Sequence, residues 1–210
     1  MTLGKFRPGL DKKYIAFNKP HAVLCQFTLP EGSTKKTLAA FDFPKDVYSV
    51  GRLDFDSEGL LILTDDSRLN SQLLSPEHNH QRTYFACVEN VPSAEQLQKL
   101  RCGVIIEGKK TLPARAKLLT EEPQLPPRAV PIRLRKYIPT AWIELSLTEG
   151  RNRQVRKMTA VVGCPTLRLV RVAIGRLSLF DLNLLPGEWK TLNEEELSWL
   201  FSSSRQMPAM

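Results

Sequence analysis

The stretch SVGRLDFDSEGLLILTDD, residues 49–66, decides the predicted fold. Its apolar run LLILT lies between two polar segments, an acidic one that follows Gly51 and the pair Asp65-Asp66. A short apolar run bounded by turn residues is typical of a buried strand. The aspartate pair also opens a short predicted helix, 67–74, in which leucines recur at helical spacing until Ser75-Pro76 ends it. The stretch therefore predicts a charged turn, a buried strand and a helix in succession.

Short apolar segments alternate with turn signals along the rest of the chain as well. They predict strands at YIAF (14–17), AVLCQF (22–27), VYSV (47–50), TYFACV (83–88), WIELSL (142–147), LRLVRVAI (167–174) and EWKTL (188–192). Further helices are predicted from the capping box at Ser93, over 152–162 and from Asn193, whereas five prolines between 121 and 139 allow only an edge strand or an extended loop. Many strands with turn-length connections and few helices predict an α+β fold with a mostly antiparallel central sheet.

The composition indicates a soluble globular protein with a locally basic surface. Of its 210 residues, 42% are apolar and 25% are charged, and no apolar run approaches the roughly 20 residues of a membrane span. We therefore expect a cytoplasmic protein without a membrane partner. The net charge of +8 is local, because residues 128–176 hold eleven basic and two acidic side chains. Nine of the eleven are arginines, which favour phosphates and stacked bases, so the charge predicts a nucleic-acid partner.

The sequence does not predict a metal site. The four cysteines form no CxxC pair and the three histidines lie at no ligand spacing from them, so we expect reduced, buried thiols. One segment resembles a calcium loop, because Asp54, Asp56, Glu58 and Gly59 follow the opening of an EF-hand. The twelfth position of such a loop would be Asp65 instead of glutamate, and the preceding segment is strand-like instead of helical. Calcium binding therefore ranks last among the interpretations of this segment.

Two other interpretations of the acidic turn stay open. It is a solvated, inert connection between strands, or it carries a catalytic carboxylate. In an extended chain, Arg52 and Asp54 start on the same face, and the guanidinium then keeps the carboxylate ionised. An ionised aspartate can act as a nucleophile, so the second interpretation makes Asp54 a catalytic candidate.

A second cluster, EGRNRQVRKM (149–158), is strongly basic. Arg151, Arg153 and Arg156 occupy the first turns of the helix predicted over 152–162, where the positive end of the helix dipole disfavours cations. An anionic partner should compensate, either a bound phosphate or a carboxylate such as Asp54. The alternative is a solvated basic helix face without a function.

Taken together, five blocks resemble the pseudouridine synthases of the ribosomal small-subunit and large-subunit type. They are FNKP (17–20), GRLDFDSEGLLILTDD (51–66), RTYFACVE (82–89), EGRNRQVRKM (149–158) and VGCPTLRLVRVAIG (162–175), in the family's order. The resemblance implies isomerisation of a specific uridine to pseudouridine in RNA, with neither cofactor nor metal. The segments FNKPHAVLCQFT, TLPARA and PIRLRKYIPTAW are similar to the branch that acts on 23S rRNA of the large subunit.

The resemblance also implies a domain organisation. We expect a single catalytic domain over 1–210, with lobes at about 12–78 and 80–201, a cleft between them, and a flexible tail at 202–210. Most members of the family begin with an S4-type RNA-binding domain, but FNKP lies so near the N-terminus that we expect none here. RNA binding would then fall on the catalytic domain itself, and we expect that domain to be a monomer.

The resemblance assigns roles to individual residues. Asp54 matches the catalytic aspartate, and Tyr84 matches a tyrosine whose ring stacks on the uracil and whose phenol takes part in proton transfer. Arg156 matches the arginine that pairs with the catalytic aspartate, and Arg52 matches the one that fills the place of the flipped base. The remaining candidates, which would contact the RNA backbone, are Lys19, Arg151, Arg153 and Lys157.

A non-catalytic RNA-binding protein on the same scaffold, for instance a ribosome-assembly factor, is the alternative function. Such a protein could lose the catalytic residues and still keep its arginines. Because Asp54 and Tyr84 are both present, the sequence favours the enzyme.

Overall fold

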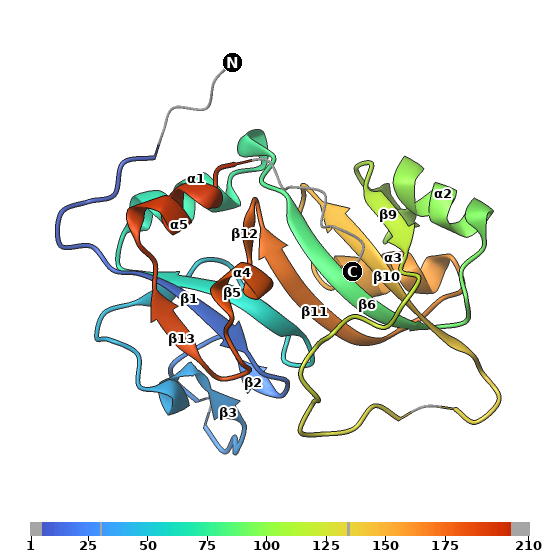
Figure 1. The fold of residues 1–210 in the computed structure, drawn as a ribbon, viewed down its shortest axis with the longest axis horizontal. Helices are drawn as coiled ribbons and strands as arrows, with labels where there is room; N and C mark the ends of the chain where they lie inside the picture. The colour runs from blue at the N-terminus through green and yellow to red at the C-terminus, as the bar shows by residue number, and fades with distance from the viewer. Residues whose placement is uncertain (1–5, 30, 134, 203–210) are drawn as a thin grey trace.

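Figure 1 shows a computed structural model of the protein, which describes residues 6–29, 31–133 and 135–202. Within these residues the chain forms an α+β fold around a nine-stranded sheet, in which seven strands follow the order β13-β1-β5-β11-β6-β10-β9. These strands are β13 (Trp189–Thr191), β1 (Tyr14–Lys19), β5 (Glu58–Thr64), β11 (Thr166–Ile174), β6 (Arg82–Glu89), β10 (Thr140–Leu147) and β9 (Arg115–Leu118). The other two are β4 (Tyr48–Ser49), which pairs with β5, and β12 (Leu177–Ser178), which pairs with β11.

The sheet is antiparallel with one exception. The described strands of this sheet pair antiparallel except for β5 and β11, whose register joins Glu58 to Val170 and Gly59 to Arg171 in parallel. The predicted α+β class with a mostly antiparallel sheet is confirmed, and the sheet is mixed at this junction. The lobe boundaries of 12–78 and 80–201 stay a prediction, although β13 pairs with β1 and so joins the half of the sheet that the N-terminal part of the chain forms.

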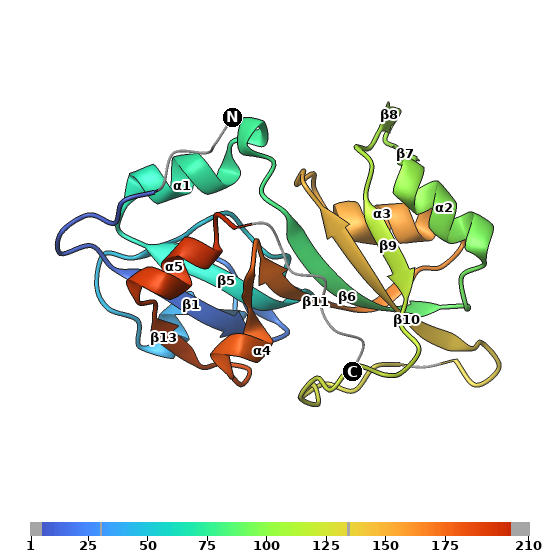
Figure 2. The same cartoon turned by 45° about the horizontal axis from the view of Figure 1, so that its top comes forward.

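The helices form two groups, with α1, α4 and α5 in the half of the molecule that holds β1, β5 and β13, and α2 and α3 in the half that holds β6, β9 and β10 (Figures 1 and 2). They are α1 (Ser67–Leu74), α2 (Ala94–Cys102), α3 (Gln154–Val161), α4 (Leu179–Leu182) and α5 (Glu194–Trp199), with 3-10 turns at Leu38–Phe41 and Pro76–His78. The predicted capping boxes at Ser93 and Asn193 are both formed, since each side chain accepts from the N3 backbone and the N3 side chain accepts in return. Residues 119–139 hold no helix or strand among those described, as the proline density predicts.

The start of α3 differs from the prediction. The helix begins at Gln154 instead of residue 152, because Arg153 takes φ 50° and ψ 33°, a left-handed conformation that interrupts a right-handed helix. Arg151 and Arg153 therefore precede the helix, and Arg156 is the one of the three that lies in its first turn. The helix dipole explains less of this basic cluster than the sequence suggested.

Several short elements were not predicted. AVLCQF shrinks to β2 (Val23–Leu24), which pairs in parallel with β3 (Lys36–Thr37), and β7 (Ile105–Ile106) and β8 (Lys109–Lys110) form a hairpin. Two-residue strands give no detectable alternation of polar and apolar residues, so the pattern could not reveal them.

The core is built around β5, which is buried along its whole length. Leu60, Leu61, Ile62 and Leu63 have no exposed surface, because alternate side chains enter hydrophobic clusters on the two faces of the sheet. The apolar run LLILT is therefore part of a central strand, and the charged turn before it lies at the end of a fully buried element.

No helix among the described residues is long and apolar enough to cross a membrane. The four cysteines are free thiols, and Cys87 and Cys164 are buried, as expected, whereas Cys102 is exposed.

Replacing Gly59 with alanine should strongly destabilise the protein. Gly59 has φ +107°, and an added Cβ would overlap the backbone of Arg171 on the neighbouring strand. Gly108→Ala is a matched control, because its φ is +74° and nothing lies within 4 Å of an added Cβ. In urea unfolding we expect Gly108→Ala to cost about 1 kcal/mol from backbone strain and Gly59→Ala at least about 3 kcal/mol. If the two substitutions lowered the free energy of unfolding equally, β5 and β11 could move apart at Gly59 without loss of stability.

Candidate active site

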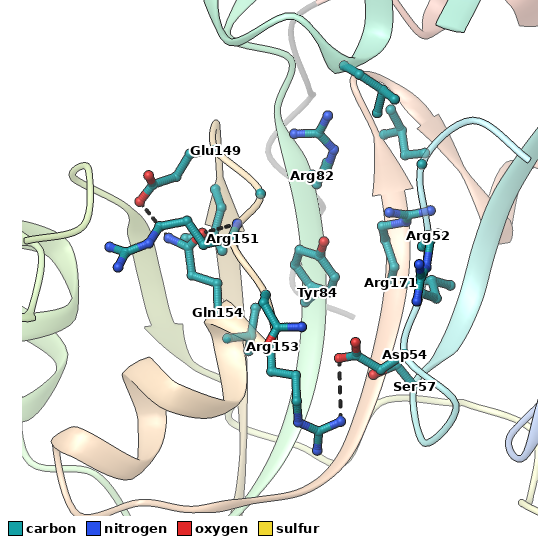
Figure 3. Close-up of a pocket in the computed structure, with 18 of the residues that line it drawn as sticks. Arg52, Asp54, Ser57, Arg82, Tyr84, Glu149, Arg151, Arg153, Gln154 and Arg171 are labelled. Carbon is teal, nitrogen blue, oxygen red and sulfur yellow. Dashed lines mark hydrogen bonds and ion pairs between the residues drawn. The ribbon is translucent and has the colours of Figure 1, made fainter. Parts of the chain in front are cut away.

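The charged turn before β5 lines a pocket of about 540 Å³. Its walls come from residues 50–54, from Arg82 and Tyr84 on β6, from the segment 147–155 between β10 and α3, and from β11 (Figure 3). This volume lies in the range of small-molecule sites, which is large enough to take a nucleoside. The pocket brings together segments that are about a hundred residues apart in the sequence.

The segment that carries Asp54 is a loop, in agreement with the predicted charged turn, because β4 ends at Ser49 and β5 begins at Glu58. Leu53 is buried, and its backbone N–H lies 3.3 Å from the sulfur of Cys25. The carbonyl of Phe55 accepts from the N–H of Ala22 at 2.9 Å, and that of Asp54 accepts from Ser57 at 3.1 Å. These contacts fix the loop, and Arg52 and Asp54 line the pocket on either side of the buried leucine.

Two aspartates and two arginines form an ion-pair cluster beside the pocket. Arg153 donates to both carboxylate oxygens of Asp56, at 2.9 and 2.8 Å, and its Nη1 lies 3.7 Å from Oδ2 of Asp54. Figure 3 shows Arg153 reaching across the pocket mouth to Asp54. Burial would raise the pKa of Asp56, but the hydrogen bond from Arg153 and the charges of Arg156 and Arg153 outweigh it and hold this pKa below its usual value.

Arg156 does not make the predicted ion pair with Asp54. Its Nε lies 3.4 Å from Oδ2 of Asp56, and its Nη2 donates to the carbonyl of Asp56 at 2.8 Å. A further bond joins Nη1 to the carbonyl of Thr166 at 3.2 Å. The cation that approaches Asp54 is Arg153, which the sequence had assigned to the RNA backbone. The sequence could not predict which of the two arginines approaches Asp54, because α3 starts later than predicted and Arg153 lies before it.

Tyr84 lies in the pocket as the resemblance implies. It is half-buried on β6, opposite Leu145 of β10 on one side and Arg171 of β11 on the other. Its ring packs against two of the hydrophobic clusters, so its position is fixed by the core while it still lines the pocket. Figure 3 shows Tyr84 between the segment that carries Arg153 and the loop that carries Asp54.

Lys19 is fully buried, and the prediction that it contacts RNA is wrong. Its ammonium group donates to the carbonyls of Pro20 and Val23, at 3.0 and 2.9 Å. Burial lowers the pKa of Lys19 to about 8, against a smaller opposing effect of Cys25 and the nearby carboxylates. The lysine of FNKP thus ties together the turn that follows β1, which could not be predicted because lysine side chains usually lie at the surface.

The two remaining candidates join α3 to the β7–β8 hairpin. Arg151 donates to the carbonyls of Ile106 and Lys109, at 2.8 and 3.2 Å, and Lys157 lies 2.7 Å from a carboxylate oxygen of Glu107. Both side chains therefore have protein partners, and their contacts with RNA stay a prediction.

The pocket also holds charged residues whose role could not be predicted from the sequence, among them Arg82 and Arg171. Arg82 donates to the carbonyl of Leu73 at 2.8 Å, where a cation is favoured near the C-terminus of α1. Nearby, Arg168 forms a buried bidentate ion pair with Glu58, at 3.0 and 2.8 Å. An arginine within an apolar strand is the signal that could have revealed this pairing, because a buried charge needs a partner.

The calcium-loop interpretation has no support in this geometry. Asp56 is bound by Arg153 and Arg156, and Glu58 is bound by Arg168, so these carboxylates are already neutralised by guanidinium groups. Strands, not helices, flank the loop.

Comparison with known proteins identifies the family. A family model described as RNA pseudouridylate synthase matches residues 13–161, most of the chain and most of the pocket. The chain belongs to this family. As an RNA pseudouridine synthase it is an isomerase that converts uridine to pseudouridine in RNA.

The relatives of this pseudouridine synthase agree with the assignment. "Ribosomal large subunit pseudouridine synthase E" of Xanthomonas axonopodis pv. citri (strain 306) is 56% identical over 77% of this chain and 85% of the relative. The protein of the same name from Vibrio vulnificus (strain CMCP6) is 48% identical over 87% of this chain and 76% of the relative. A crystal structure of a pseudouridylate synthase matches with a TM-score of 0.73 at 27% identity, over 90% of this chain and 74% of that one.

The stability of this pseudouridine synthase should depend on pH through Lys19. The folded protein releases the proton near pH 8 and the unfolded chain near 10.5, so between these values the unfolded state binds more protons and the free energy of unfolding rises with pH. Lys19→Met, which cannot titrate, is the reference. Between pH 8 and 10.5, the free energy of unfolding of the native chain, measured by urea unfolding, should rise by about 3 kcal/mol relative to that of the variant. If the free energies of unfolding of the two proteins changed in parallel with pH, the ammonium group of Lys19 would not be buried.

Proposed function

We propose that this pseudouridine synthase isomerises a specific uridine in 23S rRNA of the large ribosomal subunit, without a cofactor or metal and with Asp54 as the catalytic carboxylate. The observation that carries the proposal is one pocket lined by the carboxylate of Asp54, the ring of Tyr84 and several arginines. The relatives named as large-subunit enzymes, 48% and 56% identical to this chain, support the choice of RNA.

The reaction needs little besides a carboxylate and a shaped pocket. The N1–C1′ bond of the uridine breaks, the uracil turns within the pocket, and C5 bonds to C1′. C5 loses a proton and N1 gains one, so the nucleotide keeps its composition and no redox partner is needed. Asp54 attacks the ribose or the base, or assists formation of a glycal, and the pocket holds the detached base.

Arg153 and Tyr84 support the carboxylate in this proposal. Arg153 approaches Asp54 at 3.7 Å and places a positive charge beside it, while its bidentate bonds to Asp56 hold the guanidinium in position. Arg156 then acts indirectly, because it holds Asp56 and with it the loop that carries Asp54. The half-buried ring of Tyr84 offers a stacking face to the uracil.

Arg52 is the candidate to replace the flipped base. It is exposed and lines the pocket, so it can reach both the vacated position and a phosphate. Flipping a base out of its stack costs a few kcal/mol, and a side chain that fills the gap offsets part of that cost. Together with Arg151, which also lines the pocket, and Lys157 on the neighbouring α3, it would form an RNA-facing surface.

The basic charge is smaller at the surface than it is in the sequence. Of the arginines in 128–176, Arg168 is neutralised inside the protein by Glu58, and Arg153 and Arg156 are held by Asp56. We infer that RNA is held by a limited set of exposed cations and by the shape of the pocket. We further propose that the protein acts in the cytoplasm as a monomer.

Asp54→Asn should abolish turnover and retain RNA binding. The measurement is tritium release from 5-tritiated uridine in unmodified 23S rRNA, with filter binding of the same RNA. Asp46→Asn is the matched control, because Asp46 is exposed with φ 67°, a conformation that asparagine adopts readily. If neither the native chain nor the control released tritium but both bound RNA tightly, the result would favour the assembly factor. Equal tritium release by all three proteins would exclude Asp54 as the catalytic carboxylate.

Arg52→Gln should weaken RNA binding in a way that depends on salt. Losing one phosphate contact should reduce the slope of log affinity against log salt concentration by about one unit. Arg176→Gln is the control, since Arg176 stacks on Trp199 and does not line the pocket. An unchanged slope for Arg52→Gln would show that Arg52 is a solvated surface residue without a phosphate contact.

A further inference from the structure

Arg171 occupies an unusual position in the pocket. It lies on β11 directly opposite Tyr84 in the strand register, so the two side chains leave the same face of the sheet. Only 4% of Arg171 is exposed, yet it lines the pocket, and Figure 3 shows it between Tyr84 and the loop that carries Arg52 and Asp54.

The guanidinium of Arg171 has more donors than the protein uses. Its Nε donates to the carbonyl of Leu60 at 2.7 Å, but its Nη2 is buried and has no hydrogen-bond partner among the described residues. Within that same part of the chain no carboxylate lies within ion-pair distance, whereas the other buried arginine of β11, Arg168, is paired with Glu58. Buried donors in folded proteins are nearly always bonded, so an unused one in a pocket points to a ligand acceptor.

Resting on the proposed function, we infer that Arg171 is a further catalytic residue, whose guanidinium donates to a carbonyl oxygen of the uracil in the pocket. The position favours the base over the RNA backbone. Arg171 lies deep in the pocket beside the ring that would stack on the uracil, while the exposed cations Arg52 and Arg153 lie nearer the solvent, where phosphates can reach.

The chemistry gives this contact a larger effect after the bond breaks. When the N1–C1′ bond breaks, its electron pair stays on N1 and the negative charge spreads over O2 and O4, while C1′ is left electron-poor beside Asp54. When C5 then donates its electron pair to C1′, the C5 proton leaves and N1 takes up a proton. A buried cation that donates to O2 or O4 interacts more strongly with the anionic base than with neutral uridine. It therefore stabilises the transition state more than the bound substrate and lowers the barrier to reaction.

The first test separates rate from affinity. For Arg171→Gln and Arg171→Lys we expect single-turnover tritium release from 23S rRNA to slow by about 10- to 100-fold, the size expected for a lost charged hydrogen bond. RNA affinity and its salt slope should stay within about twofold of the native chain, because no phosphate contact is lost. Arg101→Gln is the matched control, since Arg101 also donates from Nε to a strand carbonyl, that of Ala116, but does not line the pocket.

Two results would overturn the inference. A weaker affinity with a reduced salt slope would make Arg171 a phosphate contact. A loss of rate that merely follows the unfolded fraction, measured by circular dichroism of the same samples, would make it a structural residue that holds β11 to Leu60. A native chain without any turnover would instead refute the proposed function, which keeps the two failures distinct.

The second test changes the substrate instead of the protein. RNA transcribed with 4-thiouridine or 2-thiouridine replaces one uracil carbonyl oxygen with sulfur, a weaker hydrogen-bond acceptor. If Arg171 contacts that oxygen, sulfur should slow the native chain at least about fivefold further than it slows Arg171→Gln, because the variant has already lost the bond. Equal slowing of both proteins, or slowing of neither by either substitution, would refute the contact. A purely structural arginine cannot produce this difference between substrates.

Discussion

The parallel junction of β5 and β11 is the interaction on which the rest of the structure depends. It is where the half of the sheet that contains β1, β5 and β13 meets the half that contains β6, β9 and β10. The approach is close enough that Gly59 has no room for a side chain. Beside it, the buried pair of Glu58 and Arg168 ties the start of β5 to β11, and a buried pair of this kind is costly to break because either partner alone would be an uncompensated charge.

This junction also sets the geometry of the site. Asp54 lies four residues before Glu58, in the loop that enters β5, and Arg171 follows Arg168 on β11 with its side chain bonded to the carbonyl of Leu60. Tyr84 is opposite Arg171 in the register of β6. The phenol ring and the buried guanidinium are therefore positioned by strand pairing, and the carboxylate by the loop that enters β5.

Much of this arrangement could be predicted from the sequence, because its signals are local. The apolar run before Asp65 predicts β5, and the capping boxes predict the starts of α2 and α5, since the donors and acceptors lie within four residues of one another. Partners across long sequence distances could not be predicted in this way. The exchange of roles between Arg153 and Arg156 depends on a left-handed residue at the start of α3, and the burial of Lys19 depends on the loop that folds over it.

The pocket has a consequence for the order in which a newly made chain becomes active. Its walls need residues 50–54, 82–84, 147–155 and 169–174 together, and β13, close to the C-terminus, completes the sheet by pairing with β1. A nascent chain that has not yet emerged from the ribosome beyond residue 174 lacks part of the pocket wall. The pocket therefore cannot form, and the enzyme cannot modify RNA, until synthesis has passed residue 174.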